Sequence, residues 1–476
     1  MTDSRTLDVR NPRTGENDAS INAWSAADLA AAASELRAAQ PAWAARTPEQ
    51  RVEILERWCN ALQADAGDVI DALTLDTGRR KMAANEVYAI PFILAQAKRF
   101  AGEVFAPVPD ETIAADSEVS FNTILQPYPL VGVISPWNFP LLLSLLDAIS
   151  ALVAGCAVMV KPSEITPRFV EPLQRSIDAV PELACVFRFV VGDGQTGAAL
   201  IDEVDTVCFT GSVATGRKVG ASAAANMIPA HLELGGKDPV LVLASADPKA
   251  AATAILRASV QATGQACQSL ERVYVVADVY DEFIEALVSA ANAVELNFPD
   301  INKGHVGPMI MEGQAGIIDA QIKDAVAKGA TVETGGAVET HGGGLWIRPT
   351  VLTNVTHDML VLQEETFGPV LPVMKVATAE EGINMANDSI YGLSGAVFGE
   401  ESDAKQAAAL MNGGAISIND GGLTTLAFEA EKDSYGLSGL GKSRMGQSGL
   451  QRFLRKKAII TRHGDAPDIN SMGEAG

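Results

Sequence analysis

The sequence Val131-Gly132-Val133-Ile134 begins the stretch that decides the fold, residues 129–245. Apolar runs of this kind return at 157–160, 187–191 and 207–209, and the segments between them carry apolar residues at helical spacing. Near-continuous apolar strands separated by helices are typical of a parallel sheet that is covered on both faces. The stretch therefore predicts an α/β fold.

Polar or turn-forming residues follow three of these strands. They are Pro136-Trp137-Asn138, Lys161-Pro162-Ser163-Glu164 and Thr210-Gly211-Ser212. Because ligands bind at the carboxyl ends of the strands in such sheets, we expect the three segments to meet at one edge and form a binding site. Taken singly, each segment also fits an ordinary turn or a solvated ion pair.

The residues on either side of this stretch also show helix and strand patterns. From Ser25 it is alanine-rich and helical, and a helix is expected to begin at Thr47-Pro48, where Thr47 caps and Gln50 closes a capping box. Beyond residue 246 the expected helices are 248–262, 280–296, 313–329, 378–388 and 401–411, and the expected strands are 272–276, 369–376, 394–398 and 414–418.

Residues 104–128 change character, because Val119, Phe121 and Thr123 alternate with polar neighbours as they do in strands. A further apolar strand is expected at 458–461. A hairpin that projects from an α/β chain is often an oligomerisation arm. The pattern alone fits an ordinary surface hairpin equally well.

The composition excludes several classes of protein. The 476 residues suffice for two or three domains with a sizeable core. The 36 basic and 59 acidic residues give a formal net charge of −23, which opposes binding to nucleic acid and to anionic membranes. The N-terminus lacks the apolar core of a signal peptide, and no apolar run is long enough to span a bilayer. We therefore expect a globular cytoplasmic protein.

The five cysteines include no C-x-x-C pair, and the histidines show no metal-ligand spacing. This usage predicts reduced thiols, no disulfide framework and no metal site. Four of the cysteines are expected to be buried core thiols: Cys59, Cys156, Cys185 and Cys208.

The fifth cysteine stands in a stretch that suggests chemistry. Glu233-Leu234-Gly235-Gly236-Lys237 places a carboxylate beside two glycines, and Gly264-Gln265-Ala266-Cys267 follows with a thiol 34 positions after the glutamate. An ionised, accessible thiol attacks carbonyl carbons, and a nearby carboxylate can take a proton from it or from water. By itself Cys267 is more often a small core residue, so its surroundings must decide.

These landmarks together resemble the aldehyde dehydrogenase superfamily, in the family's order and over nearly the whole chain. Seven motifs carry the resemblance: Asn11-Pro12 with Thr14-Gly15-Glu16, Pro136-Trp137-Asn138-Phe139-Pro140, Lys161-Pro162-Ser163-Glu164, Phe209-Thr210-Gly211-Ser212, Glu233-Leu234-Gly235-Gly236-Lys237, Gly264-Gln265-Ala266-Cys267 and Glu364-Glu365-Thr366-Phe367-Gly368-Pro369.

The resemblance implies a domain plan. It expects a Rossmann-like dinucleotide-binding domain at 1–104 and 129–236, and an α/β catalytic domain at 237–430. It expects a small β oligomerisation arm at 105–128 and 450–465, which would build a homodimer or homotetramer.

The resemblance also implies a reaction, the oxidation of an aldehyde to the carboxylic acid. Cys267 would add to the aldehyde to give a thiohemiacetal, and Asn138 and the Cys267 N–H would stabilise its alkoxide. Loss of hydride to the nicotinamide would leave a thioester. Glu233 would then activate the water that hydrolyses the thioester.

The cofactor is expected to be NAD, with NADP possible. In the family Lys161 and Glu164 hold the adenosine ribose, and a carboxylate there disfavours a 2′-phosphate. Ser212 would meet the pyrophosphate at a helix N-terminus. The full set of expected cofactor-binding residues is Trp137, Lys161, Ser163, Glu164, Gly211, Ser212, Leu234, Glu365 and Phe367.

Three features depart from the family's commonest pattern. Asp147 stands where many members carry a lysine that relays protons from the general base, so the proton exit route is open. The segment 431–435 replaces a Pro-Phe-Gly-Gly loop beside the substrate tunnel, so the substrate does not carry over. The residues that follow Asn138 are expected either to wall an apolar tunnel or to be helix core: Leu141, Leu142 and Leu145.

Two other functions compete with hydrolytic aldehyde oxidation. An acylating relative would pass the thioester to coenzyme A, but such enzymes tend to lack the glutamate base, and Glu233 is present. An inactive scaffold protein is disfavoured because Cys267, Asn138 and Glu233 are all in place.

Overall fold

The six-stranded sheet that carries the first binding edge is almost entirely parallel. The computed structural model describes residues 5–113 and 116–474, and this sheet has the strand order β19-β9-β8-β5-β6-β7. Only the short β19 runs antiparallel. Its strands are β5 (Leu130–Ile134), β6 (Ala157–Lys161), β7 (Phe187–Phe189), β8 (Thr206–Thr210), β9 (Ala230–Glu233) and β19 (Gly439–Leu440). The predicted α/β fold is confirmed.

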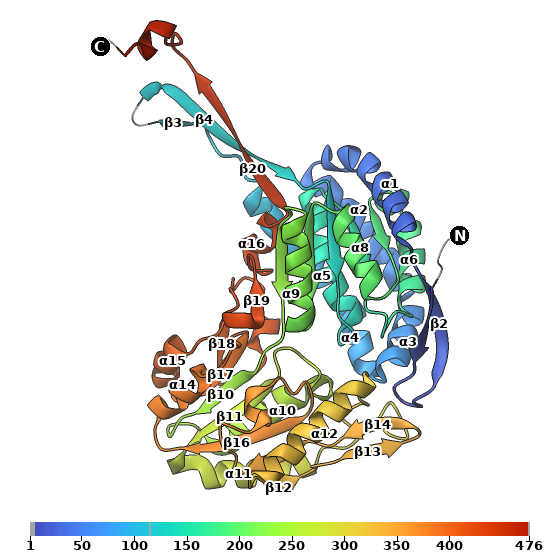
Figure 1. Cartoon of the computed structure of the whole chain (residues 1–476), viewed down its shortest axis with the longest axis vertical. Coiled ribbons are helices and arrows are strands. Elements are labelled where there is room, and N and C mark those ends of the chain that lie inside the picture. Colours follow the sequence, from blue (N-terminus) through green and yellow to red (C-terminus); the bar gives the residue numbers. More distant parts are fainter. Residues whose placement is uncertain (1–4, 114–115, 475–476) are drawn as a thin grey trace.

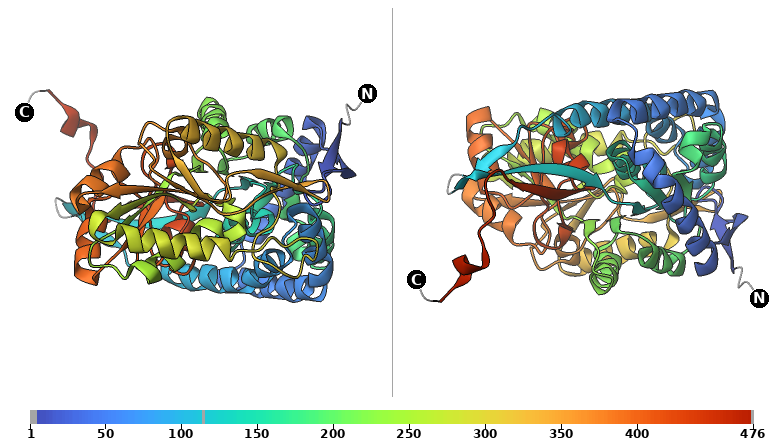
Figure 2. Two further views of the ribbon diagram at one scale, coloured as in Figure 1. Left: turned by 90° about the horizontal axis from the view of Figure 1, so that it is seen from below. Right: turned by 90° about the horizontal axis from the view of Figure 1, so that it is seen from above.

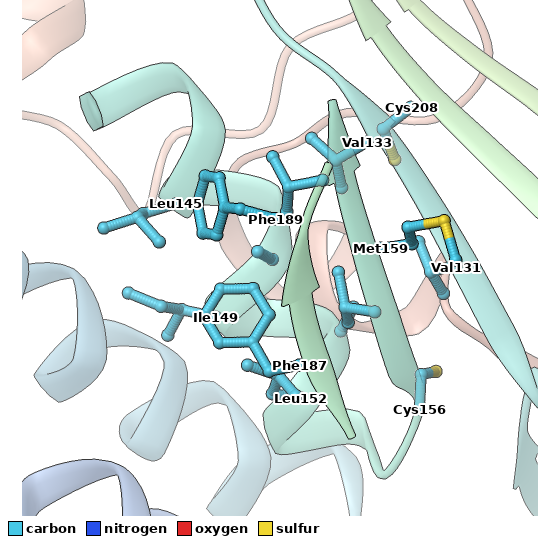
Figure 3. Close-up of a cluster of buried hydrophobic side chains, with 14 of the residues drawn as sticks. Val131, Val133, Leu145, Ile149, Leu152, Cys156, Met159, Phe187, Phe189 and Cys208 are labelled. Carbon is cyan, nitrogen blue, oxygen red and sulfur yellow. The ribbon is translucent and has the colours of Figure 1, made fainter. Parts of the chain in front are cut away.

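Helices connect these strands and cover them. They are α5 (Pro140–Ala154), α6 (Val170–Asp178), the short α7 (Pro181–Ala184), α8 (Gly194–Glu203) and α9 (Val213–Ala225). Figure 3 shows part of the core, in which Leu145, Ile149 and Leu152 of α5 lie in one buried cluster with Phe187 and Phe189 of β7. This burial holds α5 and the strand ends beside it in fixed positions.

The N-terminal hundred residues add a hairpin and four helices to this unit. They are β1 (Arg5–Arg10), β2 (Asn17–Ala23), α1 (Ala26–Ala44), α2 (Pro48–Ala64), α3 (Ala66–Thr77) and α4 (Arg80–Val104). α2 begins as predicted: Thr47 Oγ1 accepts from the Gln50 N–H at 3.3 Å, and Gln50 Oε1 accepts from the Thr47 N–H at 2.9 Å. Four consecutive residues were thus enough to predict this capping box.

A seven-stranded sheet forms the core of the second half, in the order β12-β15-β16-β11-β10-β17-β18. Its strands are β10 (Asp238–Val242), β11 (Leu270–Val276), β12 (Thr331–Thr334), β15 (Thr350–Thr353), β16 (Val370–Val376), β17 (Ser394–Phe398) and β18 (Ala415–Ile418). Its helices are α10 (Pro248–Val260), α11 (Ala277–Asn292), α12 (Glu312–Ala327), α13 (Leu360–Gln363), α14 (Ala379–Asn387) and α15 (Glu401–Leu410). A small hairpin lies beside it, formed by β13 (Val338–His341) and β14 (Gly344–Ile347).

A three-stranded sheet projects from the body as an arm (Figure 1). β20 (Leu454–Arg462) pairs antiparallel with β4 (Asp116–Pro127), from Leu454 opposite Pro127 to Arg462 opposite Val119, and β3 (Glu111–Ile113) pairs with the other edge of β4. The strands expected near 119–123 and 458–461 are therefore partners. Figure 2 shows the arm's C-terminal end and the N-terminal hairpin at opposite ends of the molecule. α16 (Gly446–Gln451) leads into β20.

The cysteines follow the prediction with one exception. All five are free thiols, and Cys59, Cys156 and Cys208 are buried. The prediction for Cys185 was wrong, because this residue ends the short α7 on a surface turn before β7 and is exposed. In residues 5–113 and 116–474, no helix is both long enough and apolar enough to cross a bilayer.

Candidate active site

The carboxyl ends of β5, β8 and β9 meet the Cys267 loop around one cavity. Eight of the residues singled out from the sequence line it: Trp137, Asn138, Gly211, Ser212, Leu234, Cys267, Glu365 and Phe367. Glu233 is one residue from Leu234, at the end of β9. Strands far apart in sequence thus bring the candidate nucleophile and most of the candidate cofactor residues to one place.

The loop that carries Cys267 has an unusual backbone. Ala262, Thr263 and Gly264 are consecutive residues with φ values of 55°, 63° and 69°, in the left-handed region. A Cβ on Gly264 would clash with the main chain of Gly368, so glycine is required there. Such strained conformations persist when their surroundings fix them, and they cluster at functional sites.

The surroundings of this loop supply that support. Arg79 Nη1 donates to the Ala262 carbonyl at 2.9 Å, and Thr263 Oγ1 donates to the Gly307 carbonyl at 3.1 Å. The fully buried Gln265 side chain donates to the Pro308 carbonyl at 3.2 Å and accepts from the Ile310 N–H at 2.9 Å. The Cys267 main chain is therefore held from both sides.

Cys267 is partly buried and lines the cavity. Burial raises the pKa of the Cys267 thiol to about 11, and the positive charge of Lys432 offsets part of that effect. At pH 7 the resting thiol is therefore protonated, and its proton must be accepted by another group when the sulfur attacks.

Asn138 lies next to the Cys267 loop. Its side chain is buried, and Nδ2 donates to the Gln265 carbonyl at 3.0 Å, which uses one of its two N–H groups. The Asn138 carbonyl accepts from Arg79 Nη2 at 2.6 Å. Arg79 therefore ties Asn138 and the Cys267 loop together, and no sequence pattern had indicated this role.

Glu233 ends β9 opposite Gly439 of β19. Its carboxylate is 17% exposed, and Oε1 lies 3.9 Å from Nε of Arg444. The next residue, Leu234, is part of the cavity wall. Glu233 thus immediately precedes a residue of the cavity wall and pairs electrostatically with Arg444.

The Lys161 segment follows β6, next to β5 in the sheet. Lys161 is buried, and its Nζ lies 3.2 Å from Glu164 Oε2 and donates to the Gly192 carbonyl at 2.8 Å. Burial lowers the pKa of Lys161, while Glu164 acts in the opposite direction. Ser163 Oγ accepts from the Ile165 N–H at 3.2 Å. The lysine of the ion pair is thus buried at the strand end, while the Glu164 side chain is 37% exposed.

Ser212 is the N-cap of α9, and its Oγ accepts from the Thr215 N–H at 3.3 Å. The first N–H groups of α9 therefore start at the cavity edge, where they favour an anion such as a pyrophosphate. The Ser212 side chain is exposed, so the helix start is open to a ligand.

Glu365 reaches the two glycines after Leu234. Its Oε1 accepts from the Gly236 N–H at 3.1 Å, and a Cβ on Gly235 would lie 2.5 Å from its Oε2. The glycines therefore allow a close approach of carboxylate and backbone. Burial raises the pKa of Glu365 to about 8, and the charge of Glu271 acts in the same direction.

Phe367 faces Trp137 across the cavity, edge to face at 5.3 Å between ring centroids. Its φ of 53° is left-handed, and its N–H donates to Glu271 Oε1 at 2.7 Å. Glu271 also accepts from Lys237 Nζ at 2.8 Å. This buried pair fixes the turn that carries Glu365 and Phe367, and the sequence did not single it out.

The other side of the cavity is apolar with one amide. Leu143, Met311 and Gln314 line it. Leu141 and Leu145 are fully buried in the core of α5, so of the two readings open for them the helix core is correct. Leu143 is two residues from each of them and therefore lies on another face of the helix, where it lines the cavity.

These features fit a bound dinucleotide. The open N-terminus of α9, the glycines against Glu365, and the paired rings of Trp137 and Phe367 lie around one cavity at the carboxyl ends of a parallel sheet. The buried Lys161 and its partner Glu164 extend the same edge. In the described part of the chain, no group of three or more His, Cys, Asp or Glu residues is arranged to hold a metal ion.

Comparisons with known proteins point to one family. The family model described as "Aldehyde dehydrogenase family" matches residues 1–459. The solved structure of a putative aldehyde dehydrogenase, PutA, from Anabaena variabilis superimposes with a TM-score of 0.95 at 48% identity, covering 98% of this chain and 99% of that one.

Two further relatives show the spread of the similarity. A putative NADP(+)-dependent succinate-semialdehyde dehydrogenase 2 of Mycobacterium ulcerans is 33% identical over 453 residues, which are 94% of this chain and 87% of that protein. Betaine aldehyde dehydrogenase from Staphylococcus aureus, solved in complex with NAD+, has a TM-score of 0.88 at 30% identity, covering 97% of this chain and 93% of that one.

Proposed function

Because the chain belongs to the aldehyde dehydrogenase family and is an NAD(P)-dependent oxidoreductase of small aldehydes, we propose that Cys267 is the nucleophile and Glu233 the base of a hydrolytic oxidation. The observation that carries the proposal is that Cys267, Asn138 and Glu365 line one cavity, and that Glu233 immediately precedes Leu234 in its wall. Neither of the two competing functions, an enzyme that passes the acyl group to coenzyme A or an inactive scaffold protein, explains the presence of that base there.

Acylation begins with Cys267. Its sulfur adds to the aldehyde carbon, the thiol proton leaves to a base, and the carbonyl oxygen becomes an alkoxide. The second N–H of Asn138 and the Cys267 N–H are the proposed donors to that oxygen. A dinucleotide bound in this cavity would supply the acceptor for the hydride that leaves this carbon. Trp137 and Phe367, which pack against each other and line the cavity, are the aromatic residues proposed to lie near its nicotinamide ring.

Deacylation consumes one water. Glu233 takes a proton from it, the oxygen adds to the thioester carbon, and the sulfur of Cys267 leaves as thiolate. The product is the carboxylic acid. The leucine and methionine on the far wall are proposed to receive the aldehyde's side chain.

We propose NAD as the preferred cofactor, with Lys161 and Glu164 on the adenosine ribose. Ser163, Gly211 and Leu234 complete that binding surface, and the N-terminus of α9 receives the pyrophosphate. A carboxylate accepts from a 2′-hydroxyl and repels a 2′-phosphate, which is the basis of the preference.

Glu164→Gln should raise kcat/KM for NADP by about tenfold, because it removes the repulsion while Lys161 stays in place. The measurement is initial-rate kinetics with both cofactors on one aldehyde. Glu171→Gln, an exposed acid on α6, is the matched control and should leave both values unchanged. If kcat/KM for NADP did not rise, Glu164 would have no part in the choice between NAD and NADP.

The substrate is assigned only as a small aldehyde. A panel of semialdehydes, aliphatic aldehydes and aromatic aldehydes, each with NAD and NADP, tests the activity and ranks the substrates by NADH or NADPH formation. Succinic semialdehyde belongs in it because a relative bears that name. No cofactor reduction with any member would contradict the proposal.

We propose that residues 1–104 and 129–236 form the dinucleotide-binding unit and 237–430 the catalytic unit, with 105–128 and 450–465 as the oligomerisation arm. The arm sheet leaves β20 as an unpaired edge, and Ile124, Ile459 and Ile460 are exposed on it, with Ile460 68% accessible. Edges and apolar faces of this kind are usually covered. A second copy of the chain is the proposed cover.

Light scattering should give a mass two or four times 49.9 kDa, as for a homodimer or homotetramer. Ile460→Lys on the arm should shift the mass toward the monomer, since it buries a charge in the interface. Ile469→Lys, on an exposed residue beyond β20, is the control and should not. A monomeric wild-type chain would contradict the assembly.

We propose a cytoplasmic location for the protein. All five thiols are free, including Cys185 on the surface, which suits a reducing compartment.

A further inference from the structure

A buried cluster of charged side chains lies behind Glu233 and has no part in the reaction described above. Arg444 Nη2 donates to Asp147 Oδ2 at 2.7 Å and to Thr210 Oγ1 at 2.9 Å. Arg452 forms a second ion pair with Asp147. Each of the three charged side chains is less than one-tenth exposed. The cluster joins α5, β8 and the segment around α16.

Arg444 is the member that reaches the proposed base. Its Nε lies 3.9 Å from Glu233 Oε1 and has no hydrogen-bond partner, although it is buried. Among the residues that the structure describes, no other cationic group lies within 4.0 Å of this carboxylate. At this separation the two groups attract one another without a hydrogen bond. The attraction holds the Glu233 carboxylate near Arg444 and still lets it move away from the guanidinium.

The charges of the cluster balance only when Glu233 is included. Burial raises the pKa of Asp147, but Arg444 and Arg452 outweigh it and hold that pKa below its usual value, so Asp147 is an anion. Burial lowers the pKa of Arg444, but Asp147 and Glu233 outweigh it and raise that pKa, so Arg444 stays a cation. Two guanidinium groups face one aspartate, and the Glu233 carboxylate supplies the second negative charge.

The neighbouring titratable groups add no charge inside the cluster. Burial, with Arg452, lowers the pKa of His231 to about 4, and burial raises the pKa of Cys208 to about 12, so both are neutral at pH 7. Lys442 is exposed at the margin. The titratable groups packed around Glu233 from α5, β8, β9 and the segment before β20 are Asp147, Cys208, His231, Lys442, Arg444 and Arg452.

Neither Asp147 nor Arg444 is suited to carry a proton. A guanidinium does not release its proton at ordinary pH, and here its pKa is raised further. Asp147 holds its charge against two cations. The lysine relay implied by the family resemblance therefore has no counterpart at this position.

We propose that Arg444, anchored by Asp147, is a positioning residue that holds the Glu233 carboxylate at the end of β9 until the thioester has formed. Its role is electrostatic, and the proton that Glu233 takes from water leaves through the cavity rather than through the cluster. The inference rests on the proposed role of Glu233 in deacylation.

The test separates acylation from deacylation in full-length Arg444→Gln. The probe is p-nitrophenyl acetate, which acylates the thiol and releases p-nitrophenol without requiring the natural aldehyde. The initial burst reports acylation, and the steady rate reports hydrolysis of the acetyl-enzyme. The burst should stay within about twofold of wild type, and the steady rate at pH 7 should fall about tenfold.

Two matched variants decide what that result means. Arg444→Lys restores the charge and should recover much of the steady rate that Arg444→Gln loses, to within several-fold of wild type. Arg452→Gln removes an equally buried cation that contacts Asp147 but not Glu233, and it should leave the ratio of burst to steady rate unchanged. An Arg444→Gln ratio of burst to steady rate identical to wild type, or an equal change of this ratio in Arg452→Gln, would overturn the inference.

If Arg444→Gln does not fold, the comparison moves to Arg444→Lys and Arg452→Lys, which keep both charges. Lysine shortens the reach of the Arg444 cation, so Arg444→Lys should lose steady rate several-fold while Arg452→Lys does not. Equal rates would overturn the inference. Glu233→Gln separates this inference from the proposed role of Glu233 as the base. A normal steady rate in Glu233→Gln would show that Glu233 is not the base. A low steady rate in Glu233→Gln beside a normal steady rate in Arg444→Gln would overturn only the role of Arg444.

Discussion

Cys267→Ala is expected to abolish aldehyde-dependent NADH formation, with a fall in kcat/KM of at least about 10³-fold. Every covalent step of the proposed reaction uses this sulfur, and no other thiol lines the cavity within the described residues. The loop backbone does not depend on the sulfur, because Arg79, Thr263 and Gln265 hold it through other atoms. The variant should therefore fold and still bind the dinucleotide.

The measurement is NADH absorbance with the best aldehyde of the panel, together with cofactor binding by fluorescence quenching. Cys185→Ala is the control, since this thiol is exposed and far from the cavity in the sheet, and it should be fully active. If Cys267→Ala kept measurable turnover while Cys185→Ala lost it, the nucleophile would be misassigned.

Glu233→Gln should show a burst of NADH of nearly wild-type size followed by a steady rate about 10²- to 10⁴-fold lower. The amide has the shape of the carboxylate but does not take a proton from water. The first hydride transfer precedes hydrolysis, so it is spared. Stopped-flow absorbance resolves the two phases, with burst amplitude compared to enzyme concentration.

A steady rate equal to wild type would show that another group activates the water. A lost burst would show that Glu233 is needed for acylation, for example to accept the Cys267 proton. The second result is a real alternative, because burial raises the pKa of that thiol to about 11 and its proton needs an acceptor.

The parts of the fold that the sequence predicted are those with strong local signals. The apolar runs that became β5, β6 and β8 are buried along their whole length, so nearly every residue in them is apolar. β10 was not singled out, since it begins with Asp238-Pro239, which is typical of a turn. The strands β12 to β15 were missed because each has only four residues, too few for a clear alternating pattern.

The site shows the same division between local and long-range information. Motif order was enough to select residues that do line one cavity, among them Trp137, Cys267 and Glu365. Contacts between distant positions were not accessible: Arg79 reaches Asn138 across 59 positions, and Arg444 reaches Asp147 across 297. A single sequence contains no sign of which arginine will meet which partner.

The central claim is that an acyl group resides on the sulfur of Cys267 until Glu233 directs water to it. The most direct measurement is the intact mass of Glu233→Gln after incubation with aldehyde and NAD, followed by peptide mapping. The account predicts a mass gain equal to the acyl group, located on the peptide that contains Cys267 and removed by hydroxylamine. A burst of NADH with no added mass, or an acyl group mapped to another residue, would contradict it.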